Sequence, residues 1–432
     1  MKAAAKVGMI ALLAVALFIP VVMIQSLVAE RQQRRDEAVN GIAEGWGKRQ
    51  TLAGPQVALP YERAWTEVSQ ELVDGKSRER RIERSESQVV HVPVENVNWM
   101  VSADITEKAR GIHKARLYVA RMQAQGTVKL PARTALEDGK SRYKWGTPRL
   151  VIGIDDPHGI RSASPANVGG KDYDFAPGSG KARIGGGLHA LLPDLQTPGA
   201  QTVNFSFTLD LAGSEAFAIA PLGADTAVSM RADWPHPSFQ GRFLPERHEI
   251  SRDGFSAQWT VSRLAGQSPA ELLAVSFIEP AGLYQQLERA SKYGFLFIGL
   301  TFAAFLLVEL LARLALHPVE YTLVGLALAM FFLLLTALSE HIAFSAAYAI
   351  AATACVGLVS AYLVRVLGSA QLGLGFGAVL AALYAMLYAL LKAEDYSLLG
   401  GSLFLFGLLA AVMIATRRVD WYGLTERRAS AT

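Results

Sequence analysis

The pattern of apolar and polar positions divides the chain into three parts. Apolar residues run almost without interruption over 7–29, and Lys2 and Lys6 precede this run. About 20 apolar residues are enough to cross a bilayer as a helix. A cleaved secretory signal is the alternative, but its apolar region would be only about 7–15 residues long. The length of the run therefore favours a retained transmembrane anchor at 1–29.

Five further apolar runs lie towards the C-terminus, and each is about as long as one membrane-spanning helix. They cover 293–316, 321–338, 342–364, 371–391 and 396–416. The pattern predicts a C-terminal bundle of five transmembrane helices over 293–416, followed by a tail at 417–432.

The polar joints between the apolar runs indicate an orientation. Arg313, Arg365 and the Arg417-Arg418 pair occupy alternate joints, and cationic joints tend to face the cytoplasm. Six spans in this orientation place both termini in the cytoplasm and the large segment 30–292 on the opposite side of the membrane. The arginines that follow the first span oppose this orientation, although long exported domains tolerate such charges.

Segment 30–292 shows the alternation of β-strands. Several short stretches alternate apolar with polar residues or are rich in β-branched and aromatic side chains. These stretches are 89–94, 149–154, 204–211, 225–234 and 255–264. Because no long helical pattern separates them, they predict a β-rich domain of antiparallel, sandwich-like sheets. The sequence SRDG at 251–254 predicts a tight turn.

Three stretches within this segment have other patterns. Apolar residues at 39, 42, 43 and 46 keep a helical spacing, which extends the first helix beyond the membrane; glycines 41, 45 and 47 are expected to loosen it. A Gly-, Pro- and Ser-rich tract near 155–198 predicts a long loop region that divides two lobes. Residues 281–291 predict a helix that continues into the second span.

Composition and motifs narrow the possible functions. The chain is 51% hydrophobic and 19% charged, with a net charge of +4, which gives no basic footprint for nucleic acid. The single cysteine, Cys355, excludes an intrachain disulfide. The sequences GSGK (178–181), His248-Glu249 and GQSPA (266–270) each lack residues that a phosphate-binding loop, a zinc peptidase helix or a nucleophile elbow requires. We therefore expect no enzymatic activity, no cofactor and no metal site.

One candidate site is the loop DWPHPSFQGRFLPE at 233–246. Its candidate docking residues are Trp234, His236, Phe239 and Phe243. Prolines on both sides of His236 fix an extended backbone. Two interpretations stay open, namely packing of an edge loop on the core, or a docking surface for a partner protein or an envelope polymer. A metal site formed by Asp233, His236 and His248 is a weaker third interpretation.

The membrane region contains two further candidates. Glu309 lies well inside a predicted span and Arg313 follows four residues later; an ion pair on one helix face is a simpler interpretation than a proton or ion route. The SEH joint at 339–341 contributes to a candidate outer-face cluster, or is a solvated polar turn. The cluster residues are Glu340, His341, Glu394 and Asp395.

Eight motifs give the chain a resemblance to a known family. They are KRQTLAGP (48–55), FSFTLDLAGSE (205–215), WPHPSFQGRFLPE (234–246), LYQQLERASKYGFLFIGLTF (283–302), LHPVEYTLVGLAL (316–328), SEH (339–341), EDYSLLGGSLFLF (394–406) and TRRVDWY (416–422). These segments are similar to those of the CreD family of inner-membrane, cell-envelope-integrity proteins. The resemblance implies one anchor, a large periplasmic domain, a C-terminal helix bundle and a link to envelope stress responses under a two-component system. It implies no catalytic residues.

The leading hypothesis is therefore a non-enzymatic inner-membrane protein that supports envelope integrity and the envelope stress response. Its periplasmic domain would bind an envelope component, and its partners would be the lipid bilayer and a periplasmic or inner-membrane protein or envelope polymer. The alternative is a transporter or lipid-handling protein with an outer-facing polar cavity. A membrane-embedded hydrolase is a third hypothesis, but the sequence offers neither a nucleophile motif nor a set of metal ligands.

Overall fold

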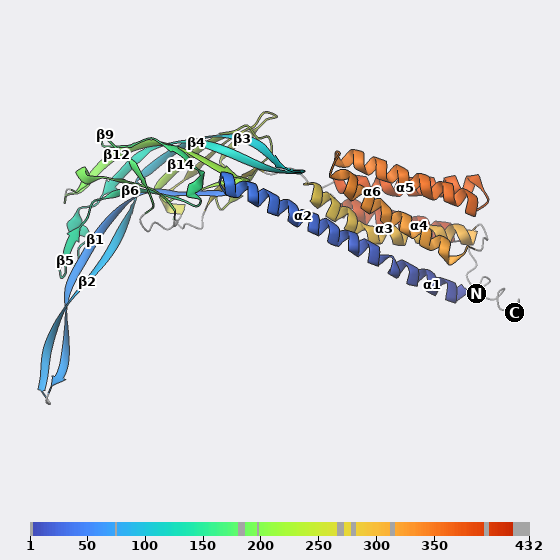
Figure 1. Ribbon diagram of the computed structural model, residues 1–432, viewed down its shortest axis with the longest axis horizontal. Helices are drawn as coiled ribbons and strands as arrows, with labels where there is room; N and C mark the ends of the chain where they lie inside the picture. The colour runs from blue at the N-terminus through green and yellow to red at the C-terminus, as the bar shows by residue number, and fades with distance from the viewer. Residues whose placement is uncertain are drawn as a thin grey trace. The chain divides into compact units, whose positions relative to one another are not determined.

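The computed structural model describes residues 3–73, 76–179, 186–196, 198–265, 272–277, 282–311, 316–392 and 397–417. The chain forms two compact units (Figure 1). The helical unit comprises Met1–Asp36 and Ala281–Thr432, and the β-rich unit comprises Glu37–Pro280.

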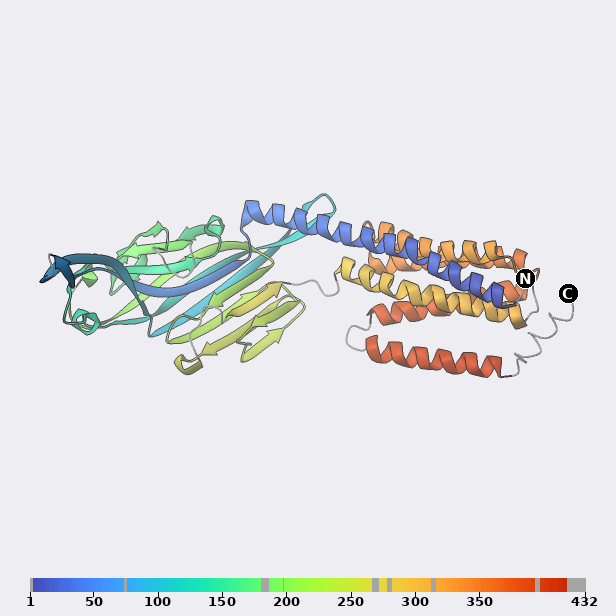
Figure 2. The same cartoon turned by 90° about the horizontal axis from the view of Figure 1, so that it is seen from below.

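The helical unit contains long helices from both ends of the chain, and they lie side by side (Figure 2). These helices are α1 (Ala3–Ala16), the first part of α2 (Phe18–Trp46), α3 (Leu283–Leu311), α4 (Pro318–Ser339), α5 (Phe344–Val366), α6 (Ala370–Lys392) and α7 (Ser397–Thr416). Within the described residues, four helices are long and apolar enough to cross a membrane, namely Leu12–Trp46, Pro318–Ser339, Phe344–Val366 and Ala370–Lys392. They coincide with the predicted anchor and with three of the five predicted C-terminal spans. Helices α3 and α7 lie where the sequence predicts the other two, but they are not among the four.

Aromatic rings and close backbone contacts hold the helical unit together. The Phe331 and Tyr384 rings, from α4 and α6, lie 4.4 Å apart between centroids, and both side chains are buried. Helices α5 and α6 approach closely at Gly373, where an added Cβ atom would lie 2.6 Å from the Val364 amide nitrogen. Small residues at such a contact are typical of helices that pack in a membrane.

The β-rich unit consists of two nine-stranded sheets. Sheet A has the order β10-β11-β6-β1-β13-β18-β15, with β2 and β5 also paired to β1, and sheet B has the order β16-β17-β14-β3-β4-β12-β8-β9, with β7 paired to β12. The strands of sheet A are β1 (Gln50–Val73), β2 (Lys76–Pro93), β5 (Arg142–Trp145), β6 (Arg149–Ile154), β10 (Phe175–Pro177), β11 (Gly187–Leu191), β13 (Ala216–Ala220), β15 (Pro237–Gly241) and β18 (Leu273–Phe277). The strands of sheet B are β3 (Asn96–Arg110), β4 (His113–Leu130), β7 (Ile160–Ala163), β8 (Ala166–Val168), β9 (Lys171–Tyr173), β12 (Gln201–Ser214), β14 (Asp225–Ala232), β16 (Arg247–Ile250) and β17 (Phe255–Val261).

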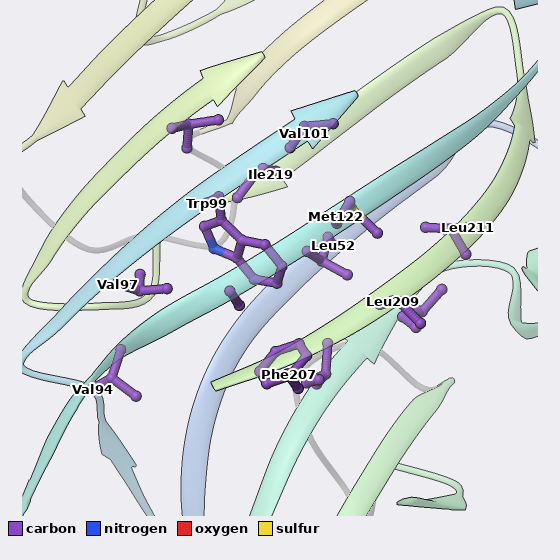
Figure 3. Packing of buried hydrophobic residues seen from close by; sticks show 14 of the residues in the cluster. Leu52, Val94, Val97, Trp99, Val101, Met122, Phe207, Leu209, Leu211 and Ile219 are labelled. Carbon is purple, nitrogen blue, oxygen red and sulfur yellow. The ribbon is translucent and has the colours of Figure 1, made fainter. Parts of the chain in front are cut away.

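The two sheets enclose one hydrophobic core, as the sequence predicts for a sandwich. Leu52 and Ile219 reach this core from sheet A, and Trp99, Met122 and Phe207 reach it from sheet B (Figure 3). The Trp99 and Phe207 rings meet edge to face with centroids 5.7 Å apart, a favoured geometry for aromatic pairs. Strands β1 and β2 continue beyond the core as a long two-stranded arm (Figure 1).

The sheets are not wholly antiparallel, although the sequence predicts them to be. Strand β1 pairs with β13 in parallel, and β14 pairs with β3 in parallel. The reason lies in how the chain changes sheets. Strand β12 ends in sheet B at Ser214, and β13 begins in sheet A at Ala216. The single residue between them, Glu215, has a φ of 57°, which few non-glycine residues adopt. Consecutive strands therefore do not form a hairpin at this point.

The expectation of a long loop region near 155–198 is wrong for the described part of that tract. It contains β7 to β11; β7, β8 and β9 join sheet B, while β10 and β11 join sheet A. Strands of three to five residues are too short to show a clear alternation, so the Gly and Pro content dominated the sequence pattern. The tract does not divide two lobes, because Val168 and Leu188 from it enter the same core.

The predicted extension of the first helix is confirmed. Helix α2 continues to Trp46, and Val39 and Ala43 are buried against Ala115 and Leu117 of β4. The glycines at 41 and 45 do not interrupt it, since both lie inside the helix. Gly47 does end it, with a φ of 146° that residues with a side chain rarely adopt.

Candidate functional site

The outward face of sheet B carries rows of uncharged polar side chains. Across β3, β4, β12 and β8, Asn98 pairs with Gln125, Gln125 with Ser206, and Ser206 with Asn167. Residues directly opposite each other point to the same face of a pleated sheet. These four side chains therefore form one row across four strands, whereas alternate residues such as Trp99 point into the core.

A second row runs beside the first and joins Asn96, Thr127 and Asn204. The two rows line a depression of about 430 Å³, which Gly126 and Phe205 complete. We call it the amide depression. Its volume falls within the range of about 300–1,000 Å³ that small-molecule sites occupy.

Gly126 pairs with Val97 and Phe205, whose side chains face the core, and the structure leaves no room for a side chain there. A Cβ atom at this position would collide with the backbone oxygen of Asn96 and would lie 2.9 Å from the Phe205 ring. Phe205 is almost fully buried and belongs to the core beneath the depression.

Three amides of the depression have free hydrogen-bonding groups. Asn98, Gln125 and Asn204 are exposed, and their side chains have no hydrogen bond or ion pair in the described part of the chain. Each amide offers one acceptor and two donors. Asparagine is depleted in strands because it packs poorly on a pleated surface. Its use at exposed strand positions, with its polar atoms unpaired, indicates a binding surface.

The charges near the depression lie at its margins. None of the described residues that line it is charged. Asp225 stands beside Asn96 in the register, and Asp172 lies opposite Asn167, whose Nδ2 donates a hydrogen bond to it at 2.7 Å. The centre of the site is therefore neutral and polar.

The candidate docking loop packs mainly inwards. Trp234, Phe239 and Phe243 are partly buried against the core of the β-rich unit. Phe239 lies on β15, the edge strand of sheet A, with its ring centroid 5.7 Å from that of Phe255. His236 is exposed. These positions fit the interpretation that the loop packs on the core.

Asp233, His236 and His248, which the sequence offers as possible metal ligands, have different neighbours. Asp233 accepts a hydrogen bond from the Ile105 backbone at 2.6 Å, and the His248 ring lies 5.3 Å from the Phe239 ring. In the described ranges, no three His, Cys, Asp or Glu residues come together as metal ligands would.

The SEH joint contacts helix α2. Glu340 caps the C-terminus of α4 and lies 3.6 Å from Arg31 of α2, measured between the carboxylate oxygen and Nε. Its side chain is only 10% exposed, whereas His341 is exposed. Glu394 and Asp395 lie outside the described residues. The structure therefore adds a cation to this cluster that the sequence did not connect with it.

Glu309 also has a partner that the sequence did not indicate. The buried Tyr321 hydroxyl of α4 donates a hydrogen bond of 2.7 Å to the Glu309 carboxylate of α3. Arg313, the predicted partner, lies outside the described residues. The bond joins two neighbouring helices, so Glu309 contributes to helix packing.

Replacing Tyr321 with phenylalanine should lower the stability of the helical unit by about 1–3 kcal/mol, because a buried acceptor loses a donor. Glu309→Gln should cost little, because the amide oxygen still accepts from Tyr321. The measurement is the thermal unfolding midpoint of the purified full chain. Tyr388→Phe is the matched control, since the Tyr388 hydroxyl has no hydrogen bond in the described structure. Equal midpoints for Tyr321→Phe and the control would contradict this role, as would a drop for Glu309→Gln as large as that for Tyr321→Phe.

Comparisons with known proteins identify relatives over almost the whole chain. A family model described as "Inner membrane protein CreD" matches residues 2–422. The inner membrane protein CreD of Escherichia coli is 30% identical over 429 residues, which cover 96% of this chain and 93% of that protein.

The solved structures that resemble this chain do so weakly. An M1 zinc metallopeptidase mutant from Deinococcus radiodurans is 10% identical, has a TM-score of 0.20 and covers 46% of this chain and 53% of its own. Leukotriene A4 hydrolase from Saccharomyces cerevisiae is 10% identical with a TM-score of 0.20, covering 46% of this chain and 35% of its own. Scores this low carry no argument about fold or activity.

Proposed function

Because this chain belongs to the CreD family of inner membrane proteins, we propose that it is a non-enzymatic protein that supports the integrity and stress response of the cell envelope. The β-rich unit binds an envelope component on the periplasmic side, and the helices anchor that unit to the inner membrane.

The observation that carries this proposal is the amide depression. Asn98, Gln125 and Asn204 place unpaired hydrogen-bonding groups around one concavity on the face of a rigid sheet. An exposed sheet face needs no such residues for folding, since threonine would suit it better. A polar partner that replaces water at these amides explains their presence.

The proposed orientation has six spans, with a five-helix bundle after the β-rich unit and both termini in the cytoplasm. Arginines at alternate joints support it through the positive-inside rule. The contact between Arg31 and Glu340 supports the placement of these two joints on the same side of the membrane. In this orientation both residues belong to periplasmic joints, and they are close enough to interact. Arg31, one of the arginines after the first span, thus has a local acidic partner.

The helical unit offers little support for the transporter alternative. A cavity between α3 and α6 is lined by apolar residues such as Phe297 and Leu387, apart from Tyr293, and holds only about 20 Å³. That volume accommodates about one water molecule. A polar route would need ionisable side chains along the bundle interior, and the buried Glu309 is engaged by Tyr321.

A complementation experiment tests the proposal. A bacterial strain that lacks this protein is exposed to an envelope-disrupting detergent, and survival is compared after expression of each variant. The wild-type chain should restore survival, whereas the triple variant Asn98→Thr/Gln125→Thr/Asn204→Thr should lose most of that effect at equal protein level. Gln258→Thr is the matched control, because Gln258 is an exposed amide on the same sheet but outside the depression. Full rescue by the triple variant would refute a function carried by the amide depression.

A further inference from the structure

We infer that the amide depression binds an uncharged glycan that carries acetamido groups. This inference rests on the proposed function and names the chemical class of the envelope component.

The hydrogen-bonding groups of the depression match those of an acetamido sugar. Asn98, Gln125 and Asn204 each present a C=O acceptor beside an NH₂ donor. An acetamido group is a trans secondary amide whose N–H and C=O point in opposite directions, so two neighbouring side-chain amides can bind it, one at the N–H and one at the C=O. The hydroxyls of Ser206 and Thr127, which also line the depression, suit the single hydroxyl groups of a sugar ring.

The charge distribution argues against an ionic ligand. A phosphate or carboxylate is usually held by Arg or Lys, whose charge-assisted hydrogen bonds are the strongest available. No described residue that lines the depression is a Lys or Arg. Asp225 and Asp172, which lie opposite lining residues in the register, are negative and would repel an anion; the cation Lys129 lies two residues beyond Thr127 on the same face, outside the lining. A neutral ligand avoids this repulsion.

Apolar surface for the C–H faces of sugar rings lies beside the depression. Phe205 is almost fully buried and does not provide it. Met100 lies two positions after Asn98 on the same face of β3 and is 42% exposed, beside the first amide row. A ligand that combines apolar ring faces with equatorial polar groups fits this mixture better than a purely polar solute does.

The position of the depression within the sheet separates a glycan from an extended peptide. Peptides that bind to sheets usually add a strand at a free edge, where backbone groups are unpaired. Strands β3, β4 and β12 lie inside sheet B, and their backbones are paired with neighbours on both sides. Only side chains are available here. The first row crosses three inter-strand gaps, or roughly 14 Å, a length that suits an oligomeric ligand lying across the strands.

The experiment measures binding of two matched oligosaccharides to the full chain. The protein is placed in lipid nanodiscs, because a glycoside detergent would compete through its own sugar. The β-1,4-linked tetramer of N-acetylglucosamine is compared with the tetramer of glucose, which has hydroxyls where the first has acetamido groups. Isothermal calorimetry and saturation-transfer NMR provide the affinities. The acetylated tetramer should bind at least tenfold more tightly than the glucose tetramer.

Variants then locate the binding. Asn98→Thr/Asn204→Thr should weaken binding of the acetylated tetramer at least tenfold without lowering the unfolding midpoint, because threonine is the better strand former. Gln258→Thr should leave the affinity unchanged. Absence of binding, equal affinity for the two tetramers, or unchanged affinity in the double variant would each overturn the inference. If the tetramer fails to bind but the triple variant still fails to rescue cells, the ligand class is wrong and the proposed function stands.

Discussion

Replacing Trp99 with alanine should lower the unfolding free energy of the β-rich unit by about 3–5 kcal/mol. Trp99 is fully buried in the core that both sheets enclose, and its ring packs edge to face on Phe207. Truncation removes the burial of a large apolar surface and leaves a cavity that the surrounding strands cannot close. The expected result is a large drop in the denaturation midpoint of this unit. Far-ultraviolet circular dichroism of the full chain measures that midpoint.

Two controls separate this effect from a general sensitivity of β3. Met100→Ala changes the next residue, which points outwards and is 42% exposed, and it should shift the midpoint little. Trp99→Phe should be tolerated far better than Trp99→Ala, because it keeps most of the ring volume and removes an indole N–H that is buried without an acceptor in the described structure. Similar midpoints for Trp99→Ala and Met100→Ala would contradict the placement of Trp99 in a core shared by both sheets.

The parts of the fold that depend on local pattern were predictable. The helical spacing of Val39, Ile42, Ala43 and Trp46 led to the correct extension of α2, because one helix face that packs on a sheet leaves a periodic signal. SRDG likewise gave the turn between β16 and β17, where the Ser251 amide donates to the Gly254 carbonyl at 2.8 Å.

The errors arose where non-local pairing decides the structure. Three-residue strands such as β8 and β9 are stable only because they pair with other strands: β8 pairs with the longer β12 and with β9. No alternation of apolar and polar residues can develop over so few positions. The parallel pairing of β1 with β13 depends on where the chain changes sheets at Glu215. A local sequence pattern contains no information about such a crossing.

The candidate site was missed for the same reason. The outward asparagines at 96 and 98, alternating with inward Val97 and Trp99, were a visible signal on one strand. The site itself requires the register that brings Gln125 and Asn204 beside them from β4 and β12. The contact between Arg31 and Glu340 could not be predicted for the same reason, because it joins α2 to a joint more than 300 residues later in the chain.

The central claim, that the β-rich unit faces the periplasm, is tested most directly by cysteine labelling in spheroplasts. The only native cysteine, Cys355, is buried, so one introduced cysteine gives a clean signal with a membrane-impermeant maleimide. Gln258→Cys places it at an exposed position of the β-rich unit, and Val319→Cys places it at an exposed position in the joint proposed to be cytoplasmic. Gln258→Cys should be labelled in intact spheroplasts, and Val319→Cys only after lysis. Protection of Gln258→Cys until lysis would contradict it.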